Sequence, residues 1–161
     1  MEKIDSFNVN HLTLLPGIYE SRRDFVGDQI LITYDLRFTQ PNAEPVMNNA
    51  EIHTIEHLAA TYLRNHPGFK DRVIYFGPMG CRTGFYLILR GEDEFSVIKT
   101  LILDTMTFIL NFEDEIPGMT ALDCGNYLDH NLWMAKFVAK KYSEKVTVSN
   151  KKTFKYVDVI Q

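Results

Sequence analysis

The sequence predicts one α+β domain, in which helices pack on one face of an antiparallel sheet. Its 161 residues suit a single domain, and we treat residues 1–161 as one unit. Hydrophobic residues make up 45% of the chain, enough to bury a core, and neither an internal repeat nor a low-complexity linker divides it. Segments with strand and helix patterns follow one another along the chain, and one layer of strands covered by helices defines the α+β class.

The first predicted strand covers residues 29–38 and ends at a polar turn. A helix follows over residues 50–65, because Asn48 or Asn49 can cap its start and Pro67-Gly68 stops it. Apolar side chains fill one arc of this helix, namely Ile52, Ile55, Leu58, Ala59, Tyr62 and Leu63. The helix therefore has a face for the core and a separate face that is free for chemistry.

Two further strands are predicted at residues 72–76 and 84–90, and a glycine-rich loop joins them. A second helix is predicted from Asp93 or Glu94 to Leu110. Its apolar side lies at helical spacing and consists of Phe95, Ile98, Ile102, Thr105 and Ile109.

A third helix is predicted from about Asn126 to Tyr142, after a break at Pro117-Gly118. The residues at helical spacing that support it are Leu128, Leu132, Ala135, Ala139 and Tyr142. Residues 147–161 are expected to be a C-terminal tail, which forms a short strand or is disordered.

The composition argues against several classes of protein. The formal net charge of -4 and the pI near 5.7 disfavour a nucleic-acid binder or a membrane-surface protein. No apolar run approaches the roughly 20 residues of a membrane span, and the first residues lack the apolar core of a signal peptide. A cytoplasmic location is therefore expected, where Cys81 and Cys124 stay reduced and can serve metal binding or catalysis.

The segment His53-Thr54-Ile55-Glu56-His57 carries the clearest chemical signal. Positions four apart lie about 40° apart around a helix axis, so His53 and His57 can bind one metal ion. Glu56 falls near the same face and can transfer protons beside that ion. The simpler interpretation is a pair of histidines at the edge of an amphipathic helix, with no metal.

A catalytic metal site needs a third protein ligand and one open position. We favour Cys124, because a cysteine at the start of the predicted third helix would be held as a thiolate. The spacing alone leaves other candidates open, which are Glu113, Glu115, Asp123, His130, His11 and Cys81. His66 and His130 are read as structural or surface histidines.

Cys81 lies in a glycine-flanked turn between two predicted strands. A neighbouring cation could lower its pKa and make it an acid or base, although a lone cysteine is more often a small buried side chain. Arg37, at the end of the first predicted strand, is either a surface charge or a clamp for a carboxylate.

Several blocks of the sequence closely resemble the S-ribosylhomocysteine lyase (LuxS) family. The resemblance covers residues 1–146, including Ser6-Phe7 and His11 near the N-terminus. The blocks that carry it are Tyr34-Asp35-Leu36-Arg37-Phe38 followed by Gln40-Pro41-Asn42, His53-Thr54-Ile55-Glu56-His57-Leu58, Gly77-Pro78-Met79-Gly80-Cys81-Arg82-Thr83-Gly84-Phe85-Tyr86, and Asp123-Cys124-Gly125-Asn126-Tyr127-Leu128-Asp129-His130-Asn131-Leu132.

The resemblance implies one ferrous ion per subunit, which zinc or cobalt often replaces, held by two histidines, one cysteine and a water. By motif, these ligands fall on His53, His57 and Cys124. The resemblance also implies that Glu56 and Cys81 form the general acid/base pair.

The same resemblance implies a homodimer with two active sites at the subunit interface, where Ser6, His11 and Arg37 line the substrate pocket. The implied reaction cleaves S-ribosylhomocysteine to homocysteine and 4,5-dihydroxy-2,3-pentanedione. That product is the precursor of the quorum-sensing signal autoinducer-2, and the step belongs to the activated methyl cycle of bacteria.

The sequence departs from the family pattern in two places. Tyr75-Phe76-Gly77 stands where many members have Asp-Ile-Ser, and Arg82 stands where glutamine is common.

Two other functions remain alternatives. One is an inverted-motif zinc peptidase, in which Glu113 or Glu115 would be the third ligand. The other is a metal-binding domain without catalytic activity.

Overall fold

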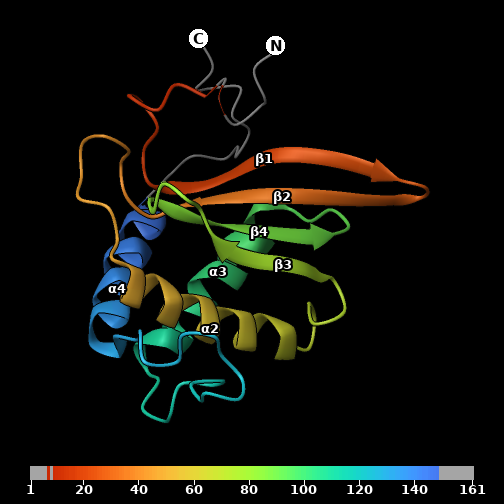
Figure 1. The fold of residues 1–161 in the computed structure, drawn as a ribbon. Helices are drawn as coiled ribbons and strands as arrows, with labels where there is room; N and C mark the ends of the chain where they lie inside the picture. The colour runs from red at the N-terminus through yellow and green to blue at the C-terminus, as the bar shows by residue number, and fades with distance from the viewer. Residues whose placement is uncertain (1–6, 8, 149–161) are drawn as a thin grey trace.

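Within the described residues, a four-stranded antiparallel sheet and three helices form two layers (Figure 1). The computed structural model describes residue 7 and residues 9–148. The strands are β1 (Gly17–Val26), β2 (Gln29–Arg37), β3 (Val73–Pro78) and β4 (Gly84–Arg90), in the order β1-β2-β4-β3. The helices are α2 (Asn49–Asn65), α3 (Phe95–Leu110) and α4 (Leu132–Val148), and all three lie on one face of the sheet. The predicted α+β class and antiparallel sheet are confirmed.

The edge strand β1 is a feature that the sequence analysis missed. It forms a hairpin with β2, in which Gly17 pairs with Arg37 and Val26 pairs with Gln29. The two-residue connection begins at Gly27, whose φ of 61° is readily adopted only by residues such as glycine. The Gly-Asp dipeptide between two runs of β-forming residues was the available sequence signal.

The other strands lie where the sequence predicts them. β4 has the predicted bounds, β3 is shifted by one or two residues, and β2 ends one residue early. Side chains alternate between the faces of β2, so Ile32, Tyr34 and Leu36 enter the core while Asp35 and Arg37 point to the other face. None of the helices in the described part of the chain covers that second face (Figure 1).

Helices α2 and α3 form for the predicted reasons. The backbone N–H of Asn48 donates to the Glu51 carboxylate across 2.8 Å, which satisfies one of the groups at the start of α2. Helix α3 begins after Glu94, its N-cap, and ends at Leu110 as predicted. Both helices bury their apolar sides against the sheet in one continuous core.

The predicted start of the third helix was wrong. Helix α4 begins at Leu132, six residues later than expected, because the Asn131 side chain accepts a hydrogen bond from the Met134 N–H at 3.0 Å and caps it there. Leu128, which was expected on the buried side, is 80% exposed. The helix runs to Val148, beyond the predicted end at Tyr142, so the first two residues of the expected tail at residues 147–161 are helical. The rest of that tail lies outside the described residues.

Tyr142 joins α4 to the sheet. Its ring stacks on Phe38 with centroids 3.8 Å apart, and its hydroxyl donates to the Gly17 carbonyl oxygen across 2.9 Å.

Among the described residues, no helix combines the length and the apolar character that crossing a bilayer requires.

Candidate metal centre and reactive cysteine

The histidine pair lies on the first turns of α2, and the fold fixes both imidazole rings. The Nδ1–H of His53 donates to the Asp129 carbonyl oxygen at 2.9 Å, and the Nδ1–H of His57 donates to the Pro117 carbonyl oxygen at 2.7 Å. A carbonyl oxygen can only accept, so each Nδ1 carries the proton and each Nε2 keeps a lone pair. Both rings are therefore in the tautomer that binds a metal through Nε2.

A glycine follows the residue that orients His57. Gly118 has a φ of 74°, a left-handed conformation that glycine adopts readily, and it comes directly after Pro117, whose carbonyl oxygen accepts from His57. The Pro117-Gly118 pair, predicted only as a chain break, thus also orients a candidate ligand.

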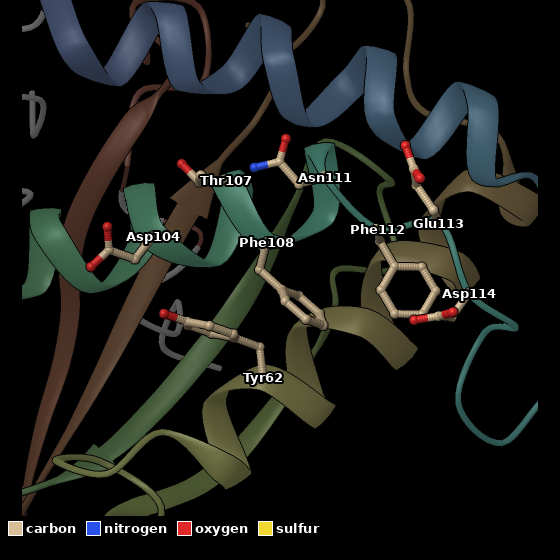
Figure 2. A pocket seen from close by; sticks show the side chains of 8 residues that line it. All are labelled: Tyr62, Asp104, Thr107, Phe108, Asn111, Phe112, Glu113 and Asp114. Atoms are coloured by element: carbon tan, nitrogen blue, oxygen red, sulfur yellow. The ribbon is translucent and has the colours of Figure 1, made fainter.

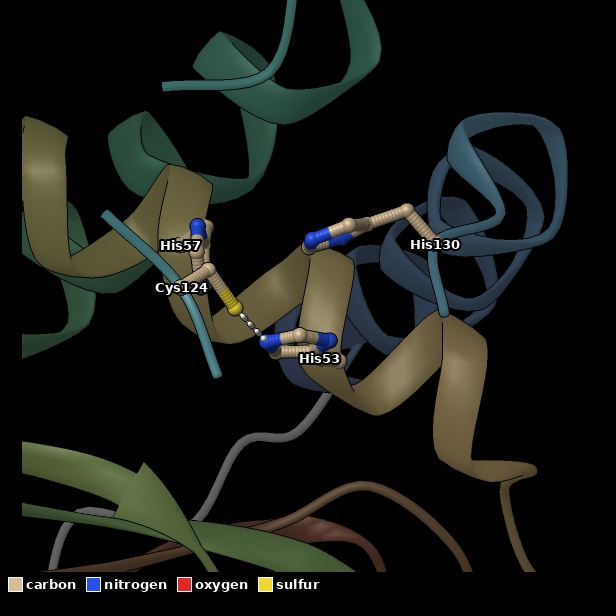
Figure 3. Close-up of side chains that lie close together, drawn as sticks. All are labelled: His53, His57, Cys124 and His130. Carbon is tan, nitrogen blue, oxygen red and sulfur yellow. Dashed lines mark hydrogen bonds between the residues drawn. The ribbon is translucent and has the colours of Figure 1, made fainter. Parts of the chain in front are cut away.

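Cys124 lies in the connection between α3 and α4, and its sulfur is 3.3 Å from Nε2 of His53 (Figure 3). The expected helix N-terminus at Cys124 is wrong, because α4 starts only at Leu132. The Asn126 backbone N–H lies 3.4 Å from the sulfur and can donate to it.

His130 joins the same cluster, although the sequence analysis read it as structural or surface. Its ring stacks on that of His53, with centroids 4.1 Å apart and planes inclined by 18°. The ligand atoms of His53, His57, Cys124 and His130 all lie within 4.8 Å of one another. Burial and repulsion from His53 and His57 lower the pKa of His130 to about 4. The sequence analysis named His130 as one of several possible third ligands, but no spacing or motif singled it out.

This donor set fits a transition metal. Imidazole nitrogens and a thiolate are borderline or soft donors, which suit Fe²⁺, Zn²⁺ or Co²⁺ better than Mg²⁺ or Ca²⁺. The other candidates for the third ligand do not belong to the cluster, and these are Glu113, Glu115, Asp123, His11 and Cys81. The donors that accompany the histidine pair in this cluster are therefore the sulfur of Cys124 and an imidazole nitrogen of His130, whereas an inverted-motif peptidase needs oxygen there.

One pocket is separate from this cluster. It has a volume of about 690 Å³, lies between α2 and α3, and is lined by Tyr62, Asp104, Phe108, Glu113 and other side chains (Figure 2). Asp104, Glu113 and Asp114 line it, but no histidine or cysteine does, so it lacks the nitrogen and sulfur donors of the cluster. The candidate site is therefore the histidine–cysteine cluster and not this pocket.

Cys81 lies in the β3–β4 loop, where its side chain is exposed. Its sulfur is 3.1 Å from the Thr83 hydroxyl and 3.9 Å from Nη1 of Arg37. Partial burial of the sulfur opposes ionisation, but hydrogen bonds from Thr83 and the positive charge of Arg37 outweigh it. Together they lower the pKa of the Cys81 thiol below its usual value.

Arg37 is only 2% exposed, so the interpretation as a surface charge is wrong. Its guanidinium forms an ion pair with the buried carboxylate of Asp35 and donates to the Thr83 hydroxyl at 2.6 Å. The buried ion pair fixes the position of the guanidinium beside Cys81.

The remaining predicted site residues are Glu56, His11 and Ser6, of which Glu56 and His11 are not part of the histidine–cysteine cluster. Glu56 lies half-buried on α2, one residue before His57. The Nδ1–H of His11 donates to the Val9 carbonyl oxygen at 2.9 Å, ahead of β1. Ser6 lies outside the described residues.

Comparison with known proteins gives the family. An α+β domain with a His–His–Cys cluster and a separate low-pKa cysteine defines a class of candidate metal-dependent enzymes. Residues 4–153 match the family model described as S-Ribosylhomocysteinase (LuxS), and the chain belongs to that family.

Individual relatives agree with the family match. The chain is 59% identical over 143 residues to the S-ribosylhomocysteine lyase of Clostridium acetobutylicum, covering 89% of this chain and 90% of that protein. It is 61% identical over 142 residues to the S-ribosylhomocysteine lyase of Finegoldia magna, covering 88% and 90% of the two chains. The S-ribosylhomocysteine lyase of Porphyromonas gingivalis is 50% identical over 159 residues, which cover 98% of this chain and 100% of that one.

Proposed function

We propose that this protein is an S-ribosylhomocysteine lyase, which cleaves S-ribosylhomocysteine to homocysteine and 4,5-dihydroxy-2,3-pentanedione. The observation that carries the proposal is the cluster of two oriented histidines and a cysteine in a chain of the LuxS family. The relatives with 50–61% identity bear the name of this enzyme. In this role the protein supplies the precursor of autoinducer-2 and takes part in the activated methyl cycle.

We assign His53, His57 and Cys124 as the ligands of one Fe²⁺ per subunit, for which zinc or cobalt can substitute. The assignment is supported by the two Nε2 lone pairs and by the sulfur 3.3 Å from His53. When bound, such an ion acts as a Lewis acid that stabilises negative charge on substrate oxygens. These side chains are half-buried, and a catalytic site with three protein ligands keeps its remaining position for water or substrate.

The reaction needs groups that move protons on carbon. The sugar carbonyl must migrate from C1 to C3 before the thioether can leave, and each migration removes and returns a proton beside a carbonyl. We assign these transfers to Cys81 and Glu56. General acid–base catalysis of this kind contributes about 10²–10⁴-fold to the rate.

The environment of Cys81 suits a base. The Thr83 hydroxyl accepts from Arg37 and can therefore direct its own proton to the sulfur. Because these contacts lower its pKa, the thiol ionises more readily near neutral pH and can remove a proton from the substrate. We propose that Arg37, His11 and Ser6 also line the substrate pocket.

We propose that two copies of the chain pair through the sheet face that the helices leave open, with one active site on each side of the interface. This face carries Leu31, Thr33, Tyr75, Tyr86 and Ile88, all exposed or only half-buried. Covering such apolar and aromatic side chains favours association. A cytoplasmic location suits the proposal, because both catalytic and ligand cysteines must stay reduced.

The test is anaerobic incubation of iron-loaded protein with S-ribosylhomocysteine, followed by a thiol assay for homocysteine. Release of one thiol per substrate is expected. Cys81→Ala should lose turnover and keep its metal, whereas Cys124→Ala should lose metal. Unchanged substrate with the wild-type protein would contradict the proposed function, and full metal content in Cys124→Ala would contradict the ligand assignment. Hydrolysis of a peptide substrate instead would favour the zinc peptidase.

A further inference from the structure

His130 is held in one tautomer by hydrogen bonds of α2. Its Nδ1 lies 3.2 Å from the Thr54 hydroxyl. That hydroxyl donates its only proton to the Ala50 carbonyl oxygen at 2.8 Å, so toward His130 it can only accept. The Asn131 backbone N–H donates to the same oxygen at 2.9 Å. Nδ1 of the neutral ring therefore carries the proton, and Nε2 carries a lone pair.

The Nε2 atom of His130 is not explained by any contact within the described part of the chain. It is buried and has no hydrogen-bond partner among these residues. It also belongs to the cluster whose ligand atoms lie within 4.8 Å of one another. A buried acceptor without a partner costs free energy unless a ligand or a water supplies a donor.

The stacking of the rings argues against His130 as a ligand of the same ion as His53. An imidazole binds a metal in the plane of its ring, at about 2 Å from the nitrogen. The two rings are stacked, with centroids 4.1 Å apart and planes inclined by only 18°. Planes in this arrangement meet far beyond bonding distance, so an ion in the plane of His53 lies over the face of His130. Figure 3 shows the two rings one above the other, with Cys124 and His57 to one side.

We propose that His130 contacts the substrate: its Nε2 accepts a hydrogen bond from a hydroxyl group of the sugar beside the metal. The proposal rests on the proposed function for the identity of the sugar. A neutral imidazole suits this task because it orients a hydroxyl group without adding charge to the cluster. His130 is then part of the active site but is not a metal ligand.

The test uses cobalt-loaded protein, because cobalt reports its ligands by absorption. The variants are His130→Phe, which keeps a stacked ring without an acceptor, and His57→Phe, which removes an assigned ligand. We expect His130→Phe to keep its cobalt affinity within about threefold of wild type and to retain the thiolate-to-cobalt absorption, measured by competition with a chelator. His57→Phe should lose cobalt affinity by more than about a hundredfold. Equal loss of cobalt in the two variants would overturn the proposal.

Substrate binding is measured in the inactive Cys81→Ala background, by the change of the cobalt spectrum on adding S-ribosylhomocysteine. Adding His130→Phe should weaken binding about three- to tenfold, as expected for one hydrogen bond, and His130→Gln should recover part of the loss. Equal affinity with and without His130→Phe would overturn this proposal alone. A Cys81→Ala protein that does not respond to the substrate at all would contradict the proposed function, and this proposal with it.

Discussion

Arg37 donates a hydrogen bond to the hydroxyl of Thr83 across 2.6 Å, and both side chains also reach the sulfur of Cys81. Asp35 holds the guanidinium from the other side. Arg37 at the end of β2 and Thr83 in the β3–β4 loop thus lower the pKa of the Cys81 thiol, and Asp35 of β2 fixes the position of Arg37. Their arrangement gives the first prediction.

Thr83→Val should raise the pKa of Cys81, because the sulfur loses the hydroxyl hydrogen bond that stabilises its anion. The rate of alkylation by iodoacetamide near neutral pH should fall severalfold, and its pH profile should shift upward. Thr39→Val is the matched control, since Thr39 is also buried nearby but does not contact the sulfur. Equal pH profiles for Thr83→Val and wild type would contradict the role of Thr83.

Glu44 should make the protein more stable above pH 4.5 than at strongly acidic pH. Partial burial opposes its ionisation, but hydrogen bonds from Lys145 and Gln40 outweigh burial and lower the pKa of Glu44 to about 2. A lowered pKa means that this stabilisation is complete above the ordinary value and is lost as the pH falls from 4.5 to about 2.

Glu44→Gln should therefore reduce the free energy of unfolding at pH 7 by about 0.5–1 kcal/mol, the range for a partly exposed ion pair. The difference from wild type should shrink at pH 2, and urea unfolding at both pH values measures it. A difference that is the same at both pH values would show that the carboxylate charge is not involved.

Tyr142→Phe should destabilise the protein by about 1–3 kcal/mol. The stack on Phe38 would survive, but the Gly17 carbonyl oxygen would lose the hydrogen bond from the buried hydroxyl. Thermal or urea unfolding measures the effect. Tyr62→Phe serves as the comparison, because Tyr62 lines the open pocket between α2 and α3, and it should change stability by less than about 0.5 kcal/mol.

Tyr75 and Gly77 should be energetically coupled. A Cβ on Gly77 would lie 2.0 Å from the Tyr75 hydroxyl oxygen, so any larger residue at 77 must displace that ring. Gly77→Ala should therefore cost about 1 kcal/mol more in the wild type than in a Tyr75→Ala background. A double-mutant cycle by urea unfolding measures the coupling, and additive effects would show that the ring moves away without cost. The coupling would also explain why both positions depart together from the Asp-Ile-Ser pattern.

Local sequence patterns predicted most elements of the fold and the centre of the site. The periodicity of α2 and α3 and the bounds of β4 could be read directly, and the His53–His57 pair follows from helix geometry alone. The strand β1 was missed because its polar residues obscure the alternation, although the turn after it was visible. Local periodicity also placed the start of α4 too early, since residues 129–131 make hydrogen bonds to His53 and Thr54 of α2.

The role of His130 could not be read from the sequence for the same reason. Its approach to His53 depends on contacts between segments 76 residues apart, in which Thr54 and His53 of α2 bind the turn before α4. The Arg37–Thr83–Cys81 contacts likewise depend on the pairing of β2 with β4. Sequence reasoning identified Arg37 and Cys81 as candidates but not their contact with each other.

The carbonyl groups that accept from His53 and His57 belong to the same α3–α4 connection that carries Cys124. The imidazoles therefore hold this connection against α2 before any ion arrives. The entropy that the connection loses when it becomes ordered is thus lost during folding and not on metal binding. An incoming metal finds a preorganised shell, and binding should proceed without a slow conformational step. Exchange between iron, cobalt and zinc should then follow the ligand preferences of each ion and not the flexibility of the protein.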